Sequence, residues 1–224
     1  MVRAAVAIRC AKTATKVLLL TATSIYNEPY DLANLVAMAR GEDPLSKKAF
    51  AKMRIDGYAF KKYFECIFSF YDVPVDKENY PEMEEHWVDI EMTPKYYQEY
   101  LKVEHENSDY FGNPWVLLTG MRQASNSLEE CIKCDWVLKT VKKGGKFLIY
   151  SAFLTFGVEK LQALFKQHKI KYREITGSMK MEERTEAVAD YNAGKVDVLF
   201  ITKAGGEGLD LKGTRKVIIF ESSS

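Results

Sequence analysis

The fold of this chain is decided by the stretch KVDVLFITKAGGEGLDL, which runs from Lys195 to Leu211. Its first part, Val196 to Ile201, is a short apolar run of the kind that forms buried strands in parallel sheets. Three glycines follow at Gly205, Gly206 and Gly208. Glycines allow backbone amides to approach an anion that a Cβ atom would keep away. Because open α/β sheets bind ligands at the carboxyl ends of their strands, we expect a phosphorylated ligand at this loop.

A tight turn between a strand and the next element is the alternative interpretation of this loop. The chain has no Gly-x-x-x-x-Gly-Lys-Ser/Thr motif, and Leu211 stands where the third glycine of a dinucleotide fingerprint would lie. The loop alone leaves both interpretations open, so the neighbouring segments must decide between them.

The second half of the chain alternates between predicted strands and helices. Strands are predicted at 146–151, 171–175, 196–201 and 215–220. Helices are predicted at 134–141, around Leu161, and at 181–192. This alternation is typical of right-handed βαβ units, and it predicts an α/β fold with a parallel sheet.

The first half has a mainly helical pattern. Helices are predicted at 2–15, 31–38, 94–103 and 115–123, and strands at 16–20 and 86–92. Gly41 is expected to end the second helix, and Thr93-Pro94 to begin the third. Between residues 50 and 71, aromatic and lysine side chains alternate in a way that favours an amphipathic helical core over a surface that stacks bases. Residues 72–85 are acidic, contain two prolines and form a candidate linker.

The charge of the chain does not by itself indicate a nucleic-acid-binding protein. Thirty-two basic residues oppose 31 acidic ones, for a net charge of +1. Local basic clusters occur at 47–48, 61–62, 142–143 and 166–173. Such a cluster is usually a solvated face, and it can bind nucleic acid only if the fold gathers the charges on one side. No apolar run approaches the length of a membrane span, so no membrane partner is expected.

The four cysteines are expected to be free thiols, because nothing in the sequence marks secretion. Cys131 and Cys134 have zinc-ligand spacing, but the chain has no second pair, and its three histidines are scattered. Cys134 also fits the apolar face of a helix. We therefore expect a structural role for this pair and no metal site.

Five stretches, in this order, resemble the motifs of Swi/Snf-type superfamily 2 helicases. They are LLLTATSIYN at 18–27, MRQASN at 121–126, FLIYSAF at 147–153, TGSM at 176–179 with Glu183-Arg184, and TKAGGEGLDL at 202–211. They are similar to motif III, the Leu-Arg-Gln-x-x-Asn stretch, motif IV, the motif after it and motif V. The sequences of these stretches are most similar to those of helicases of large DNA viruses, including those that act in viral transcription.

The resemblance implies a RecA-like lobe, with a parallel sheet and flanking helices, preceded by a helical protrusion and linker region. It assigns 1–27 to the end of a first helicase lobe, 28–130 to the protrusions and linker, and 131–224 to the second lobe. The phosphate-binding lysine of motif I, the metal-binding acids of motif II and the arginine finger of motif VI are missing from the sequence. Phosphoryl transfer depends on those charges, so the chain alone is expected not to hydrolyse ATP.

Site residues follow from the resemblance by position. Coupling between the ATP site and the nucleic-acid site falls to Thr21, Ala22 and Thr23. Nucleotide binding falls to Glu207, Gly208 and Asp210, with Asp210 accepting a hydrogen bond from a ribose hydroxyl. The residues expected to bind the backbone phosphates of the nucleic acid are Ser151, Gly177, Ser178, Arg184, Thr202, Lys203, Ala204 and Gly205. Arg184 fits a cap on a neighbouring loop equally well. No catalytic residue or metal ligand is assigned, and Ser151, Gly177 and Gly205 must share one rim of the sheet.

The resemblance also implies the ligands. The complete protein would use ATP and Mg²⁺, with neither bound tightly to this chain. Its partners would be double-stranded DNA, the missing first lobe and transcription machinery. Contacts to backbone phosphates carry no base information, so binding would be independent of sequence and sensitive to salt. The alternatives are an RNA helicase of the same superfamily and a non-enzymatic nucleic-acid-binding or scaffold module. The expected location is intracellular: the nucleus or, for a viral protein, the viral factory or the virion.

Overall fold

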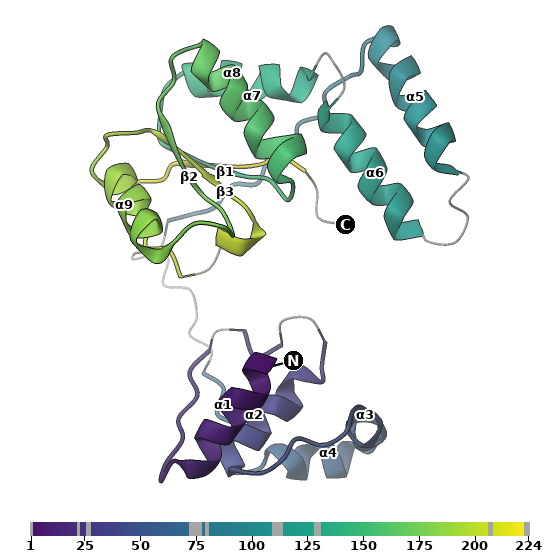
Figure 1. Ribbon diagram of the computed structural model, residues 1–224, viewed down its shortest axis with the longest axis vertical. Coiled ribbons are helices and arrows are strands. Elements are labelled where there is room, and N and C mark those ends of the chain that lie inside the picture. The colour runs from purple at the N-terminus through teal and green to yellow at the C-terminus, as the bar shows by residue number, and fades with distance from the viewer. Residues whose placement is uncertain are drawn as a thin grey trace. The chain divides into compact units, whose positions relative to one another are not determined.

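The computed structural model describes residues 2–21, 23–25, 28–71, 78, 81–108, 114–127, 131–205 and 208–221 (Figure 1). It divides into two compact units, Met1–Glu84 and Glu85–Ser224, and each is described by itself. Ala22, Glu207 and most of the candidate linker at 72–85 lie outside the described residues. No helix in the described ranges is long and apolar enough to cross a membrane.

The first unit contains helices α1 (Val2–Thr13), α2 (Asp31–Arg40), α3 (Lys47–Ile55) and α4 (Gly57–Phe64). Helix α2 ends as predicted, because Gly41 takes a left-handed conformation with φ of 68° and donates its N–H to carbonyls of the last turn. Asp56 begins α4, since its carboxylate accepts hydrogen bonds from the amides of Tyr58 and Ala59.

An aromatic cluster forms the core of this unit. Phe50 is buried, and the rings of Tyr30, Phe60 and Tyr63 meet it edge-on at centroid distances of 5.8, 6.3 and 6.3 Å. Such edge-to-face pairs are the favoured geometry of packed aromatic rings. The predicted helical core is therefore confirmed for Phe50, Phe60, Tyr63 and Phe64. It was wrong for Tyr58, Phe70 and Tyr71, whose side chains are 75%, 81% and 85% exposed.

Two predicted strands are absent from the structure, and both predictions were wrong. Residues 16–20 and 86–92 have no regular secondary structure. In the first segment, the side chains of Leu18 and Leu20 are 80% and 85% exposed. A strand is stable only when neighbouring strands take its hydrogen bonds, and neither segment pairs with a strand among the described residues. Local β-propensity therefore was not enough to form a strand at either place.

The second unit begins with a pair of packed helices, α5 (Pro94–Ser108) and α6 (Pro114–Ser127). Thr93 begins α5 as predicted, because its hydroxyl accepts a 3.2 Å hydrogen bond from the amide of Tyr96. The buried hydroxyl of Tyr96 donates a 2.8 Å hydrogen bond to the carbonyl of Ser125 on α6. This bond joins the two helices, which lie side by side in Figure 1.

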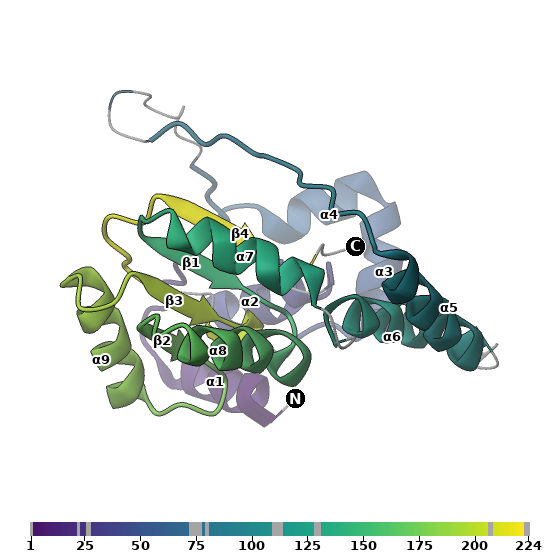
Figure 2. The same cartoon turned by 90° about the horizontal axis from the view of Figure 1, so that it is seen from above.

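The rest of the second unit is a four-stranded parallel sheet with the order β2-β3-β1-β4 (Figure 2). Its elements are α7 (Ile132–Lys142), β1 (Phe147–Tyr150), the π-helical turn η1 (Leu154–Val158), α8 (Glu159–Gln167), β2 (Tyr172–Ile175), α9 (Met181–Asn192), β3 (Val198–Ile201), the 3₁₀ turn η2 (Lys203–Gly205) and β4 (Lys216–Ile219). The predicted strands and helices of this half are confirmed, and so is the predicted α/β class with its parallel sheet.

Alternate residues of the strands build two cores on opposite faces of the sheet. Phe147, Ile149, Val198 and Phe200 pack against α7 and α8. Leu199 and its neighbours on the other face pack against α9. Figure 1 shows α7 and α8 together on one face and α9 on the other. Helices therefore cover both faces of the sheet at β2 and β3, whereas Val217 and Ile219 of the edge strand β4 are 60% and 65% exposed.

Cys131 and Cys134 are joined by a disulfide, so the prediction of four free thiols was wrong. The first turn of α7 brings their Cα atoms to 5.2 Å, within the range that a disulfide spans. The sequence prediction relied on the cell compartment and did not consider this local geometry. Cys10 and Cys66 are free and exposed.

Candidate nucleic-acid interface

The loops after three strands meet at one rim of the sheet. The amide of Thr202, after β3, donates a 3.3 Å hydrogen bond to the carbonyl of Ile175, at the end of β2. The amide of Ser151, after β1, donates a 3.1 Å hydrogen bond to the carbonyl of Ile201. Because the strands are parallel and in register, the segments that follow them lie at the same edge. The expectation that Ser151, Gly177 and Gly205 share a rim is thereby confirmed.

The first loop of this rim is 176–178. Its Thr176 is buried, with its hydroxyl 3.3 Å from that of Ser178, whereas Gly177 and Ser178 are exposed. Arg184 reaches from α9 and donates a 2.9 Å hydrogen bond from Nη2 to the carbonyl of Thr176. Arg184 thus caps the neighbouring loop, which is one of its two predicted roles. Its contact with phosphate stays a prediction.

The second loop of the rim is 202–205, which includes η2. The amide of Gly205 donates a 2.8 Å hydrogen bond to the carbonyl of Thr202 and closes the turn. Gly205 is buried, and a Cβ atom there would lie 2.6 Å from the carbonyl oxygen of Ile175. This glycine is therefore needed for the close packing of two loops, in agreement with the tight-turn interpretation. Lys203 is exposed beside it, and only the backbone of Ala204 is described.

Ser151 has a structural role that differs from the predicted one. Its side chain is fully buried, and its hydroxyl lies 2.7 Å from Oε1 of Glu221. The amide of Phe153 donates a 3.2 Å hydrogen bond to the same hydroxyl. Gly157 packs so closely that a Cβ atom there would lie 1.9 Å from Ser151 Oγ. Since this hydroxyl is enclosed and already bonded, we do not keep Ser151 among the phosphate-binding groups.

Asp210 lies apart from the rim. Its side chain is exposed, and its nearest ionic partner is Lys212, at 3.9 Å. Its carbonyl accepts a 2.9 Å hydrogen bond from Asn192, the last residue of α9, whereas the rim loops lie beside the first residues of that helix. Gly208 precedes it with φ of 73°, a backbone conformation that favours glycine. The structure therefore does not bring Asp210 together with residues 176–178 and 202–205. Its contact with a ribose stays a prediction.

The two predicted coupling threonines lie in the first unit. The hydroxyl of Thr21 accepts a 3.0 Å hydrogen bond from the amide of Thr23 and lies 3.0 Å from the carbonyl of that residue. This is a local turn with both side chains exposed. Their role in coupling stays a prediction.

A buried polar network behind the rim was missed by the sequence reasoning. Glu221 accepts hydrogen bonds from Asn126 Nδ2, at 2.6 Å, and from the amide of Ala152, at 3.0 Å. Lys133 donates to Asn126 Oδ1 at 3.0 Å. Burial lowers the pKa of Lys133, although the charge of Glu221 acts in the opposite direction. Asn126 belonged to a recognised motif, but no sequence signal pointed to Glu221 as its partner.

The sheet order, the helices on both faces and the loops gathered at the carboxyl edge define a RecA-like α/β lobe. Residues 126–224 match the family of the helicase conserved C-terminal domain. This part of the chain therefore matches a helicase C-terminal domain, in agreement with the expected second helicase lobe.

Proteins named as helicases are among the relatives that are similar in sequence. A protein of Acanthamoeba polyphaga mimivirus, whose assigned name is that of an ATP-dependent RNA helicase, is 33% identical over 242 residues, which cover 93% of this chain and 54% of the relative. An uncharacterized ATP-dependent helicase of Schizosaccharomyces pombe is 33% identical over 135 residues, which cover 58% of this chain and 12% of that protein. The chain thus spans about half the length of the mimivirus relative.

Solved structures of SWI2/SNF2 ATPases from Sulfolobus solfataricus are among those similar in fold. The C-terminal domain of a SWI2/SNF2 ATPase is 18% identical, with a TM-score of 0.46, over 58% of this chain and 68% of that chain. A SWI2/SNF2 ATPase core in complex with dsDNA is 16% identical, with a TM-score of 0.47, over 58% of this chain and 33% of that chain.

Proposed function

We propose that residues 126–224 are the second lobe of an ATP-dependent translocase that grips the backbone of duplex DNA. The observation that carries the proposal is the rim, where loops 176–178 and 202–205 lie side by side at the carboxyl edge of the sheet. In open α/β sheets this edge is where ligands bind. A second lobe that closes on a first lobe would use such an edge to hold the nucleic acid during each ATP cycle.

The chemistry of the rim fits backbone phosphates. Gly177 exposes backbone, Ser178 exposes a hydroxyl, and Lys203 adds an exposed ammonium group. Groups of these kinds contact phosphate and sugar and carry no direct information about base sequence. We therefore expect binding that is independent of sequence and weakens as salt is added.

The residues present do not fit a complete ATPase site. Among the described residues, no three His, Cys, Asp or Glu side chains come together in a way that could hold a metal ion. Asp210 could accept a hydrogen bond from a ribose, but no lysine or arginine is assigned to the γ-phosphate. We propose that ATP and Mg²⁺ act only when a first lobe is present, and we assign no hydrolytic step to this chain.

Binding of duplex DNA by the 224-residue chain tests this proposal. We expect Lys203→Ala to reduce by about one the slope of log affinity against log salt, since one phosphate contact is lost. Lys139→Ala removes the same charge from the exposed side of α7 and serves as the matched control. If the two variants had equal slopes of log affinity against log salt, the rim would not be part of the DNA interface.

An RNA-directed function is the second candidate, because the mimivirus relative carries the name of an RNA helicase. Duplex DNA and duplex RNA of the same sequence, titrated in parallel, distinguish the two. Clearly tighter binding of the RNA duplex, with the Lys203→Ala effect confined to RNA, would favour the RNA candidate. We also propose, for the DNA translocase, an intracellular location and a role in viral transcription.

A further inference from the structure

A basic surface lies at the edge of the sheet opposite the rim, near the starts of β2 and β3. There the structure contains a recess of 480 Å³ whose lining includes Lys166, Lys171, Arg173 and Lys195. We call these four residues and the space between them the basic recess. All four side chains are exposed, and they come from the end of α8, the loop before β2, β2 itself and the loop before β3. Three of them belong to the 166–173 cluster, and the fold adds Lys195 from elsewhere.

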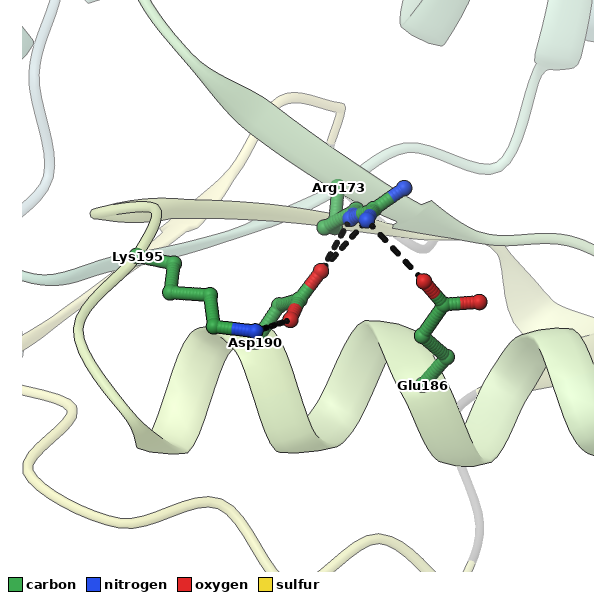
Figure 3. A network of polar contacts seen from close by, with 4 residues as sticks. All are labelled: Arg173, Glu186, Asp190 and Lys195. Atoms are coloured by element: carbon green, nitrogen blue, oxygen red, sulfur yellow. Dashed lines mark hydrogen bonds and ion pairs between the residues drawn. The ribbon is translucent and has the colours of Figure 1, made fainter.

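One buried carboxylate fixes two of these cations in place. Asp190 is 5% exposed, and its Oδ1 accepts a 2.8 Å hydrogen bond from Lys195 Nζ. Its Oδ2 accepts a 2.8 Å hydrogen bond from Arg173 Nε and a second bond from Arg173 Nη2. Figure 3 shows Arg173 and Lys195 reaching Asp190 from two sides, with Glu186 next to Arg173. Holding these side chains in advance lowers the conformational entropy that a ligand would have to remove.

The charges of the recess remain unbalanced. Among the described residues that line it, Asp190 is the only acid, against four cations. Glu186 approaches Arg173 at 3.4 Å from the exposed surface of α9 and offsets one further charge. An excess of positive charge on an open surface attracts polyanions and raises their association rate.

We propose that the basic recess binds the phosphates of a nucleic-acid backbone, as a second contact separate from the rim. The recess lies at the amino ends of the strands and the rim at their carboxyl ends, so the two edges contact different stretches of backbone. A lysine-rich, open surface suits phosphates, which need charge and little shape complementarity. This inference does not rest on the function proposed for the rim, and it holds for DNA or RNA.

The test uses the variant Lys166→Ala/Lys171→Ala/Lys195→Ala and leaves Arg173 and Asp190 in place. The matched control, Lys48→Ala/Lys52→Ala/Lys61→Ala, removes three exposed lysines from the first unit and changes the net charge equally. Duplex DNA is titrated against each protein at several salt concentrations. The recess variant should bind at least roughly tenfold more weakly at low salt, with a salt slope reduced by about two to three. Losses no larger than those of the control would overturn the proposal.

Lysine acetylation footprinting locates the contact directly in the unmodified chain. Saturating duplex should protect Lys166, Lys171 and Lys195 from an acetylating reagent in the wild type, and the Lys203→Ala variant should show the same protection. If a polyglutamate peptide protects these lysines and nucleic acid does not, the site takes acidic polypeptides and our assignment is wrong. If Lys203→Ala left DNA binding unchanged while the recess lysines stayed protected, the result would count against the rim proposal alone.

Discussion

The side-chain amide of Asn126 donates a 2.6 Å hydrogen bond to the carboxylate of Glu221, although 95 positions separate the two residues. Asn126 lies near the end of α6, and Glu221 follows β4. Ser151, at the end of β1, shares the same carboxylate oxygen. The carboxylate of Glu221 therefore connects α6 to the ends of the neighbouring strands β1 and β4.

The first prediction concerns the stability that Glu221 provides. Glu221→Ala leaves the Asn126 side-chain amide and the Ala152 backbone amide without their acceptor, and it should lower the free energy of unfolding by roughly 2 to 4 kcal/mol. Glu221→Gln keeps the shape and one carbonyl acceptor, so it should cost less. Urea denaturation measures both. Glu91→Ala, at an exposed site, is the control and should change stability by less than about 0.5 kcal/mol. An equally small effect for Glu221→Ala would show that the network does not stabilise the lobe.

The second prediction concerns the contact between Gly157 and Ser151. Gly157→Ala places a methyl group 1.9 Å from Ser151 Oγ and 2.9 Å from its Cβ, so the single variant should lose about 1 to 3 kcal/mol through overpacking. In a Ser151→Ala background the closest of these contacts is gone, and the same substitution should cost less. A double-mutant cycle of unfolding free energies measures the difference. Strictly additive effects would contradict the close approach of these residues.

The third prediction concerns pH and Asp190. Hydrogen bonds from Lys195 and then from Arg173 lower the pKa of Asp190 in the folded state, against the opposing effect of burial. A lowered carboxyl pKa stabilises the fold above the ordinary Asp value of about 3.9, and this stability is lost as pH falls through the folded value. Wild type should therefore be more stable than Asp190→Asn at pH 6, and the gap should narrow below about pH 4. A gap that stays constant down to pH 2.5 is the contrary result.

The fourth prediction concerns the cysteines. Cys131 and Cys134 form a disulfide, whereas Cys10 and Cys66 are free. Thiol titration of the protein unfolded without reductant should detect only Cys10 and Cys66, and all four cysteines should react after reduction. In the Cys131→Ser/Cys134→Ser variant, reduction should leave the count unchanged. Four reactive thiols in the unreduced wild type would show that the disulfide does not form.

The sequence predicted well the parts of the fold in which local signals agree with long-range packing. The strands at 147–150 and 198–201 are apolar and short, and the helix at 181–192 was predicted with its observed bounds. The rim followed from these elements, because parallel strands bring their carboxyl ends to one edge. Segments 16–20 and 86–92 have similar local patterns, but a strand also needs a partner, which no local pattern contains.

The sequence by itself determined the alternation of strands and helices, the parallel sheet and the edge at which loops 176–178 and 202–205 gather, because each depends on hydrophobic period and chain connectivity. Only the tertiary structure decided what individual side chains do there. It enclosed the hydroxyl of Ser151 against Glu221, turned Arg184 onto the carbonyl of Thr176, and joined Lys195 to Arg173 through Asp190. Such contacts depend on which distant residues the packed elements bring within hydrogen-bonding distance, about 2.7 to 3.3 Å.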